Sequence, residues 1–96
     1  MNKHYTEVGE IIIPAHENEE SVTTLHVFDV DDEKAAELYE AKYGASIGFA
    51  AWEIVRDDLN ICDDYGVPPG APFHRYTVDF VLPHTVLLYD TMAYNV

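Results

Sequence analysis

The residues of this chain best suited to chemistry are its carboxylates, and one group of them has a regular spacing. Glu33, Glu37 and Glu40 lie four and three residues apart. In an α-helix this spacing places the three side chains along one face, with neighbours about 5–6 Å apart. A row of negative charges at that separation is comparable to the phosphates along a nucleic-acid strand. The stripe therefore has the charge and the spacing to attract the basic side chains that bind phosphates.

A second set of carboxylates brackets the end of the apolar segment that follows. It consists of Asp57, Asp58, Asp63 and Asp64. The C-terminal end of a helix favours cations, so aspartates at that end are locally unfavourable. Aspartates at this position are easier to explain if a partner protein binds them. These four aspartates and the glutamate stripe form the predicted partner-binding surface; the alternative is a solvated acidic face that only keeps the protein soluble.

The overall charge indicates which kind of partner this surface would bind. The 96 residues include 18 Asp and Glu against 5 Lys and Arg, which gives a formal net charge of −13. A surface this acidic is repelled by nucleic acid and by anionic membranes, and it is attracted to basic clefts. We therefore predict no direct nucleic-acid binding and no membrane binding. The predicted partner is a basic nucleic-acid-binding protein or a nuclease complex.

The sequence offers little that indicates catalysis or a cofactor. It contains no Walker A and no Gly-x-Gly-x-x-Gly motif. The single cysteine, Cys62, precedes two aspartates, which is a poor setting for a thiolate nucleophile. The five histidines show no His-x-His or His-x₃-His spacing. We predict that the chain is not an enzyme and has no metal and no cofactor, with a two-histidine site of His26 and His74 on adjacent strands as the alternative.

The elements that must position these carboxylates follow from the apolar patterns. Strands are predicted over 5–13, 22–30, 73–82 and 85–96. Between them, one helix is predicted from a cap at Asp31 or Asp32 to Gly44, and a second from a cap at Ser46 through about 47–59. The order β-β-α-α-β-β favours an α+β fold, with a small antiparallel sheet and two helices packed on one face. Residues 1–96 are predicted to form a single acidic domain.

The helix patterns also predict which side chains are buried. Ala35, Leu38, Tyr39 and Tyr43 share one apolar face of the first helix. The second helix is apolar over much of its circumference, so Trp52 and its neighbours are expected to be the most buried part of the chain. Most aromatic residues are therefore assigned to the core. One or two exposed tyrosines beside the carboxylates would suit an arginine-rich partner.

These observations favour a stoichiometric protein inhibitor that imitates nucleic-acid phosphates and blocks a basic enzyme or complex. Phage anti-restriction and anti-CRISPR proteins and nuclease immunity proteins are comparable in size and charge. The alternative is a structural or regulatory protein-interaction module in which the acidic surface only confers solubility. A halophilic domain and a small ligand-binding domain are further rivals. No apolar stretch follows the N-terminal residues, so we expect a cytoplasmic protein, in the host cytoplasm if a phage encodes it. The oligomeric state stays open, with a dimer among the options.

Overall fold

The computed structural model describes residues 3–15, 21–44, 48, 50–81 and 83–95. The elements are β1 (Tyr5–Ile13), β2 (Val22–Val30), α1 (Asp32–Tyr43), α2 (Ala51–Asp58), β3 (Pro72–Val81) and β4 (Thr85–Tyr94). The predicted order β-β-α-α-β-β and the α+β class are confirmed. The predicted cap at Ser46 and the start of the second helix near Ile47 lie outside the described residues, and α2 begins at Ala51.

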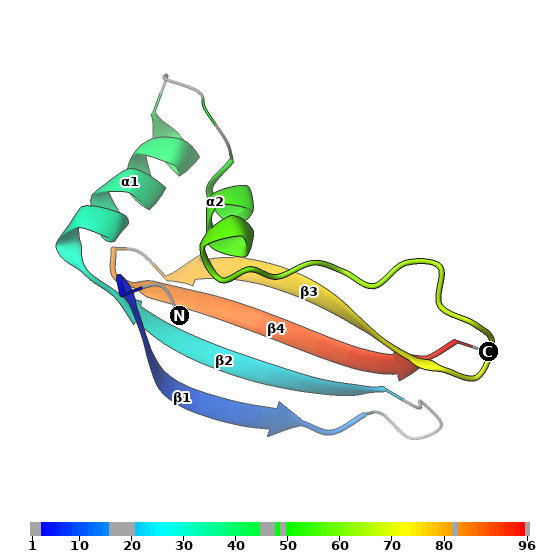
Figure 1. The fold of residues 1–96 in the computed structure, drawn as a ribbon. Coiled ribbons are helices and arrows are strands. Elements are labelled where there is room, and N and C mark those ends of the chain that lie inside the picture. Colours follow the sequence, from blue (N-terminus) through cyan, green and yellow to red (C-terminus); the bar gives the residue numbers. More distant parts are fainter. Residues whose placement is uncertain (1–2, 16–20, 45–47, 49, 82, 96) are drawn as a thin grey trace.

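The sheet has four antiparallel strands in the order β1-β2-β4-β3. The chain forms the β1–β2 hairpin, leaves the sheet for the two helices, returns as β3 at the far edge and ends as β4 in the middle. Both helices stand over one face at one end of the sheet, and the strands extend well beyond them (Figure 1). The helices therefore cover only part of that face. Among the described residues, no helix is long and apolar enough to cross a membrane.

Helix α1 begins and ends where its flanking residues favour it. The carboxylate of Asp31 accepts a hydrogen bond from the backbone N–H of Lys34 at 2.8 Å, which caps the first turn. Asp32 and Glu33 in the first turn and Lys42 in the last turn complement the helix dipole. At the other end, the backbone N–H of Gly44 donates to the carbonyl of Glu40 at 2.7 Å. Residues beside the helix, Asp31 and Gly44, thus determine where it begins and ends, as the sequence predicts.

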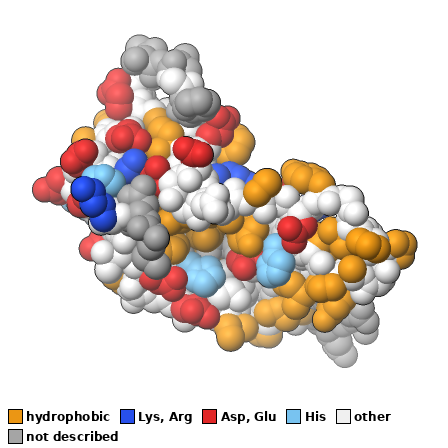
Figure 2. Space-filling model, in the orientation of Figure 1, with side chains coloured by type: hydrophobic (Ala, Val, Ile, Leu, Met, Phe, Trp, Pro, Cys, Tyr) orange, Lys and Arg blue, Asp and Glu red, His pale blue; other side chains and the backbone are white. Residues whose placement is uncertain are grey.

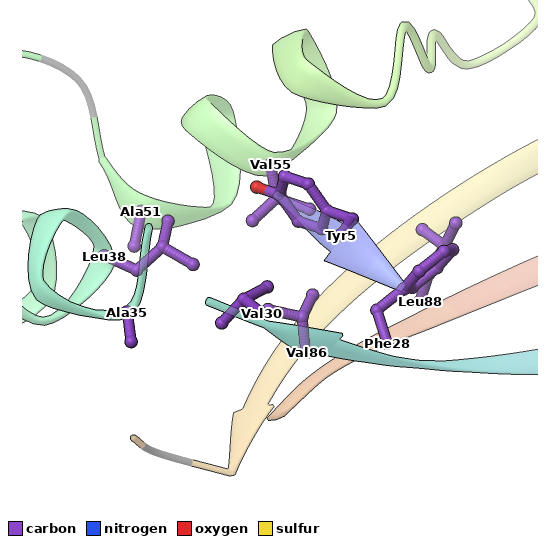
Figure 3. Packing of buried hydrophobic residues seen from close by; sticks show 9 residues of the cluster. All are labelled: Tyr5, Phe28, Val30, Ala35, Leu38, Ala51, Val55, Val86 and Leu88. Carbon is purple, nitrogen blue, oxygen red and sulfur yellow. The ribbon is translucent and has the colours of Figure 1, made fainter. Parts of the chain in front are cut away.

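The core lies between the helices and the near end of the sheet (Figure 3). Leu38 from α1, Val55 from α2 and Val86 from β4 are its fully buried large side chains. Tyr5 and Phe28 pack edge to face, with ring centroids 6.2 Å apart. The buried strand residues come from the start of β1 and β4 and from the end of β2, so the core occupies one end of the molecule.

Three aromatic residues predicted to be core are instead exposed. Tyr39, Tyr43 and Trp52 have exposed fractions of 54%, 60% and 49%. Helix α1 turns Leu38 and its neighbour Ala35 toward the core, which leaves both tyrosines on its flank. Helix α2 has only eight residues, and only Ala51 and Val55 of this helix are buried. Trp52 therefore lies beside the part of α2 that packs on the core.

The face of the sheet opposite the helices carries apolar side chains across its strands. In the strand pairing Ile11 lies beside Leu25, and Leu25 lies beside Tyr89. Val27 and Leu87 form the next row on the same face. Partners in a register share a face, and this face is the one that Phe28 and Val86 do not occupy. Both helices lie on the other side (Figure 1), so this open face has no helix over it.

Candidate functional site

A hollow of about 450 Å³ lies between the two helices and is lined mainly by carboxylates. Its lining residues are Glu37 from α1 and Glu53, Ile54, Asp57 and Asp58 from α2. We call these five residues the acidic groove. The groove joins members of the two acidic sets that the sequence placed on different helices. Glu53 was missing from the prediction, although its spacing of four residues from Asp57 would have placed the two on one helix face.

The floor of the groove holds one buried cation, Lys34. Its Nζ donates to Asp58 Oδ2 at 2.8 Å and to Glu37 Oε1 at 3.0 Å. Burial disfavours the charged ammonium, but the hydrogen bonds to Asp58 and Glu37 outweigh this, so the pKa of Lys34 is raised. The four carboxylates that line the groove carry a formal charge of −4, and Lys34, which is bonded to two of them, reduces this to −3.

Asp58 has a structural role in this floor. Besides the contact with Lys34, its Oδ2 accepts a hydrogen bond from the hydroxyl of Tyr5 at 2.7 Å. Burial and this contact with a carboxylate raise the pKa of Tyr5 and keep its hydroxyl protonated. As a member of the predicted partner-binding surface, Asp58 was expected to be exposed, but its side chain is only 16% exposed and links α2 to Lys34 of α1 and Tyr5 of β1.

The accessible carboxylates of the groove are those of Glu37, Glu53 and Asp57. Glu37 and Asp57 are exposed and Glu53 is half-buried. Within the described part of the chain, no lysine, arginine or histidine forms an ion pair with Glu53 or Asp57. These two carboxylates of α2 therefore remain available to a cation from outside.

The exposed sides of α1 carry further carboxylates and two aromatic rings. Glu33 and Glu40 are exposed on the same stripe of α1 as Glu37, and acidic side chains gather over the helical end of the molecule (Figure 2). On the flank of α1, the rings of Tyr39 and Tyr43 lie with centroids 5.0 Å apart. Such rings offer faces on which a guanidinium can stack. These rings lie on a different side of α1 from Glu37, because residues two positions apart on a helix do not face each other, and Lys42 Nζ already lies 5.5 Å from the centroid of the Tyr43 ring.

Asp63 and Asp64 lie outside the groove and contact the outer edge of β3. Asp63 Oδ1 accepts from Arg56 Nη2 and from the backbone N–H of Tyr76, both at 2.9 Å. Asp64 Oδ2 accepts from the backbone N–H of His74 at 2.8 Å. Burial raises the pKa of Asp63, but the contacts with Arg56 and Tyr76 outweigh it, and the pKa is lowered overall. These aspartates satisfy backbone donors of an edge strand, which would otherwise be open to pairing.

Histidines pair with carboxylates at four places in the described residues. The pairs are His4–Asp31, His26–Glu7, His74–Asp90 and His84–Asp32. The alternative of a two-histidine site on adjacent strands is wrong, because β4 lies between the strands that carry His26 and His74. Cys62 is exposed.

Comparison with known proteins adds nothing to this description: no protein-family model, curated protein or solved structure matches the chain. Its function is therefore argued from the geometry of its own residues.

Proposed function

We propose that the acidic groove and the α1 stripe bind a basic protein, and that the chain acts as a stoichiometric inhibitor of a nucleic-acid-binding enzyme or complex. The observation that carries this proposal is the groove itself, where two helices bring four carboxylates to one hollow and a single lysine is bonded to two of them. Like charges brought together in this way repel one another in the isolated protein. A basic partner would relieve that repulsion on binding.

The mechanism is competition for the partner's cationic side chains. Lysines and arginines of a nucleic-acid-binding cleft contact phosphates and release counterions from the nucleic acid. In the proposed complex they contact Glu37, Glu53 and Asp57 instead. Arginine suits this surface best, because its planar guanidinium binds a carboxylate through two hydrogen bonds and also stacks on aromatic rings. Tyr39 provides an exposed ring on α1, whereas the exposed ring of Trp52 on α2 already has Arg56 Cζ 5.9 Å from its centroid.

Anti-restriction, anti-CRISPR and nuclease immunity proteins are the functional classes that this mechanism favours. In the proposed mechanism the chain acts without catalysis, by occupying a cationic surface of its target. In this proposal the protein needs no cofactor and meets its target in the cytoplasm, which would be the host cytoplasm for a phage protein. The expected binding depends strongly on salt, because attraction between exposed charges is screened beyond about 10 Å at 0.1 M ionic strength.

The test is a double charge reversal in the groove, Glu53→Lys with Asp57→Lys. We expect the variant to fold. Its affinity for the target protein should fall at least about tenfold, chiefly because association becomes slower. The matched control is Asp29→Lys with Asp79→Lys, two exposed residues on the open face of the sheet. Both variants change the net charge of −13 by the same two reversals, so only the position of the charges differs.

The assay is capture from a host lysate followed by displacement with added DNA or RNA. A nucleic-acid-handling protein that is captured by the wild type and the control, lost with the groove variant and displaced by nucleic acid supports the proposal. If the amount of captured protein is the same at low and high salt, with and without nucleic acid, and with the groove variant, the proposal is refuted.

The open face of the sheet favours a second candidate function, a protein-interaction module. Ile11 and Ile13 are exposed on this face at the edge of β1, next to a row of half-buried apolar residues on β2 and β4. A partner on this face would bury apolar area and be insensitive to salt. The variant Ile11→Lys with Ile13→Lys should abolish capture if this candidate is right, and should leave capture unchanged if the groove is the binding site.

A further inference from the structure

Strand β1 contains an irregularity that places two glutamates on the same face. Glu7 pairs with Phe28 and Gly9 pairs with Val27, so β1 has one extra residue at this point. In a regular strand, residues three positions apart point to opposite faces. Here the extra residue brings Glu7 and Glu10 onto the face that carries the helices. Bulges of this kind often re-aim side chains beside functional sites.

The two glutamates meet a histidine from the neighbouring strand. Glu10 is the register partner of His26, and His26 Nδ1 lies 3.2 Å from Glu7 Oε1. One ligand atom from each of Glu7, Glu10 and His26 can be chosen so that all lie within 4.8 Å of one another. The imidazole also lies near the ring of Phe28, with centroids 6.4 Å apart.

We propose that Glu7, Glu10 and His26 form a binding site for a divalent transition-metal ion, with Zn²⁺ as the best fit. Imidazole nitrogen and carboxylate oxygen are both common zinc ligands, with bonds of about 2.0–2.2 Å. Tetrahedral ligands at that bond length are about 3.4 Å apart, so the ligand atoms, which lie within 4.8 Å of one another, must approach by up to about 1.4 Å. Rotation of two exposed glutamate side chains supplies a movement of this size.

The charge and the surroundings of the group also suit a cation. Two carboxylates beside one neutral imidazole carry a formal charge of −2, which a divalent ion neutralises. Three protein ligands leave a fourth tetrahedral position for water or for a group of a partner. Glu7 and His26 also line a hollow of about 610 Å³ beside the end of α2. The open position can therefore be reached from this hollow, which adjoins the acidic groove and shares only Asp58 with it.

The same face offers a matched comparison. His74 Nδ1 lies 2.7 Å from Asp90 Oδ1, so this pair resembles the His26–Glu7 pair. Within the described residues, the only group of three such ligands is the one at Glu7, Glu10 and His26. A histidine–carboxylate pair without a third ligand should bind zinc much more weakly. His74→Ala is therefore the control for His26→Ala.

The experiment is calorimetric titration of the untagged full chain with ZnCl₂, together with thermal unfolding with and without zinc. We expect one strong equivalent and a rise in the unfolding temperature, because the ion binds the folded state. His26→Ala and Glu10→Gln should each weaken zinc binding at least about tenfold and remove the thermal shift, whereas His74→Ala should change neither. MgCl₂ at the same concentration should not compete, because magnesium prefers six oxygen ligands.

Either of two results would overturn the metal site. One is the absence of saturable zinc binding by the folded wild type in the micromolar range. The other is equal weakening by His26→Ala and His74→Ala. Circular dichroism of each variant shows whether it is folded. If His26→Ala does not fold, Glu10→Gln still tests the site, because Glu10 is exposed and its replacement should not disturb the fold. Because none of the three proposed ligands lines the acidic groove, failure of the metal site leaves the proposed inhibitor function untouched.

Discussion

Replacing Lys34 with methionine tests the construction of the groove floor. The side chain of Lys34 is 8% exposed and that of Asp58 is 16% exposed, so their 2.8 Å ion pair is largely shielded from water. Removing one member of a fully buried pair costs about 3–5 kcal/mol, because the other charge is left without its partner. Asp58 keeps the hydrogen bond from Tyr5 and some contact with water. We therefore expect Lys34→Met to lower the free energy of unfolding by about 2–3 kcal/mol.

The neighbouring pair provides the internal control. Glu37 is also bonded to Lys34, at 3.0 Å, but its side chain is 51% exposed. Exposed pairs contribute about 0–1 kcal/mol, so Glu37→Gln should cost much less than Lys34→Met. The double variant Lys34→Met with Asp58→Asn should cost less than the sum of its single variants, because it leaves no buried charge behind.

The measurement is urea denaturation at neutral pH, followed by far-ultraviolet circular dichroism. The dependence of the unfolding free energy on urea should be equal in all variants if the folded and unfolded states are otherwise unchanged. A cost below about 0.5 kcal/mol for Lys34→Met, or an equal cost for Glu37→Gln, would show that the buried pair does not hold the helices together.

Three further outcomes are expected. In the same denaturation assay, Leu38→Ala should lower the free energy of unfolding by about 2–5 kcal/mol. Trp52→Ala should lower it by less than about 1 kcal/mol, because only Leu38 is buried. A larger loss for Trp52→Ala than for Leu38→Ala would contradict the observed packing. Because the pKa of Tyr5 is raised in the folded state, stability should fall as pH rises above about 10, and a titration of unfolding against pH should show a weaker fall in Tyr5→Phe. Because the pKa of Asp63 is lowered, its contribution should be lost as pH falls below about 4, and Asp63→Asn should reduce this acid-side loss; an unchanged acid limb would argue against the Arg56 contact.

Several features of this protein follow from the sequence because they depend on neighbouring residues. The alternation of Tyr76, Val78 and Phe80 with polar residues predicts β3, and the structure shows that strand with the same alternation of burial. Asp31 caps α1 as predicted, because a cap needs only its own side chain and a backbone N–H three residues on. The α+β class follows from the order of such elements, which is a local property read along the chain.

The rotation of each helix about its own axis was decided by tertiary structure alone. The sequence pattern shows that α1 has an apolar side, but packing selects which part of that side is buried. Leu38 fills the core while Tyr39 remains outside. A helix of eight residues buries only a narrow stripe, which is why Trp52 is exposed although its segment is strongly apolar.

The two candidate sites also depend on contacts between distant parts of the chain. The acidic groove exists because α1 and α2 pack side by side, which joins Glu37 to Glu53 and Asp57. The group of Glu7, Glu10 and His26 exists because β1 pairs with β2 through a bulge, and residue spacing does not reveal a register shift. The sequence alone determined how much negative charge the protein carries and which elements bear it. Only packing and strand register, which join residues far apart in the chain, decided which of those charges face one another.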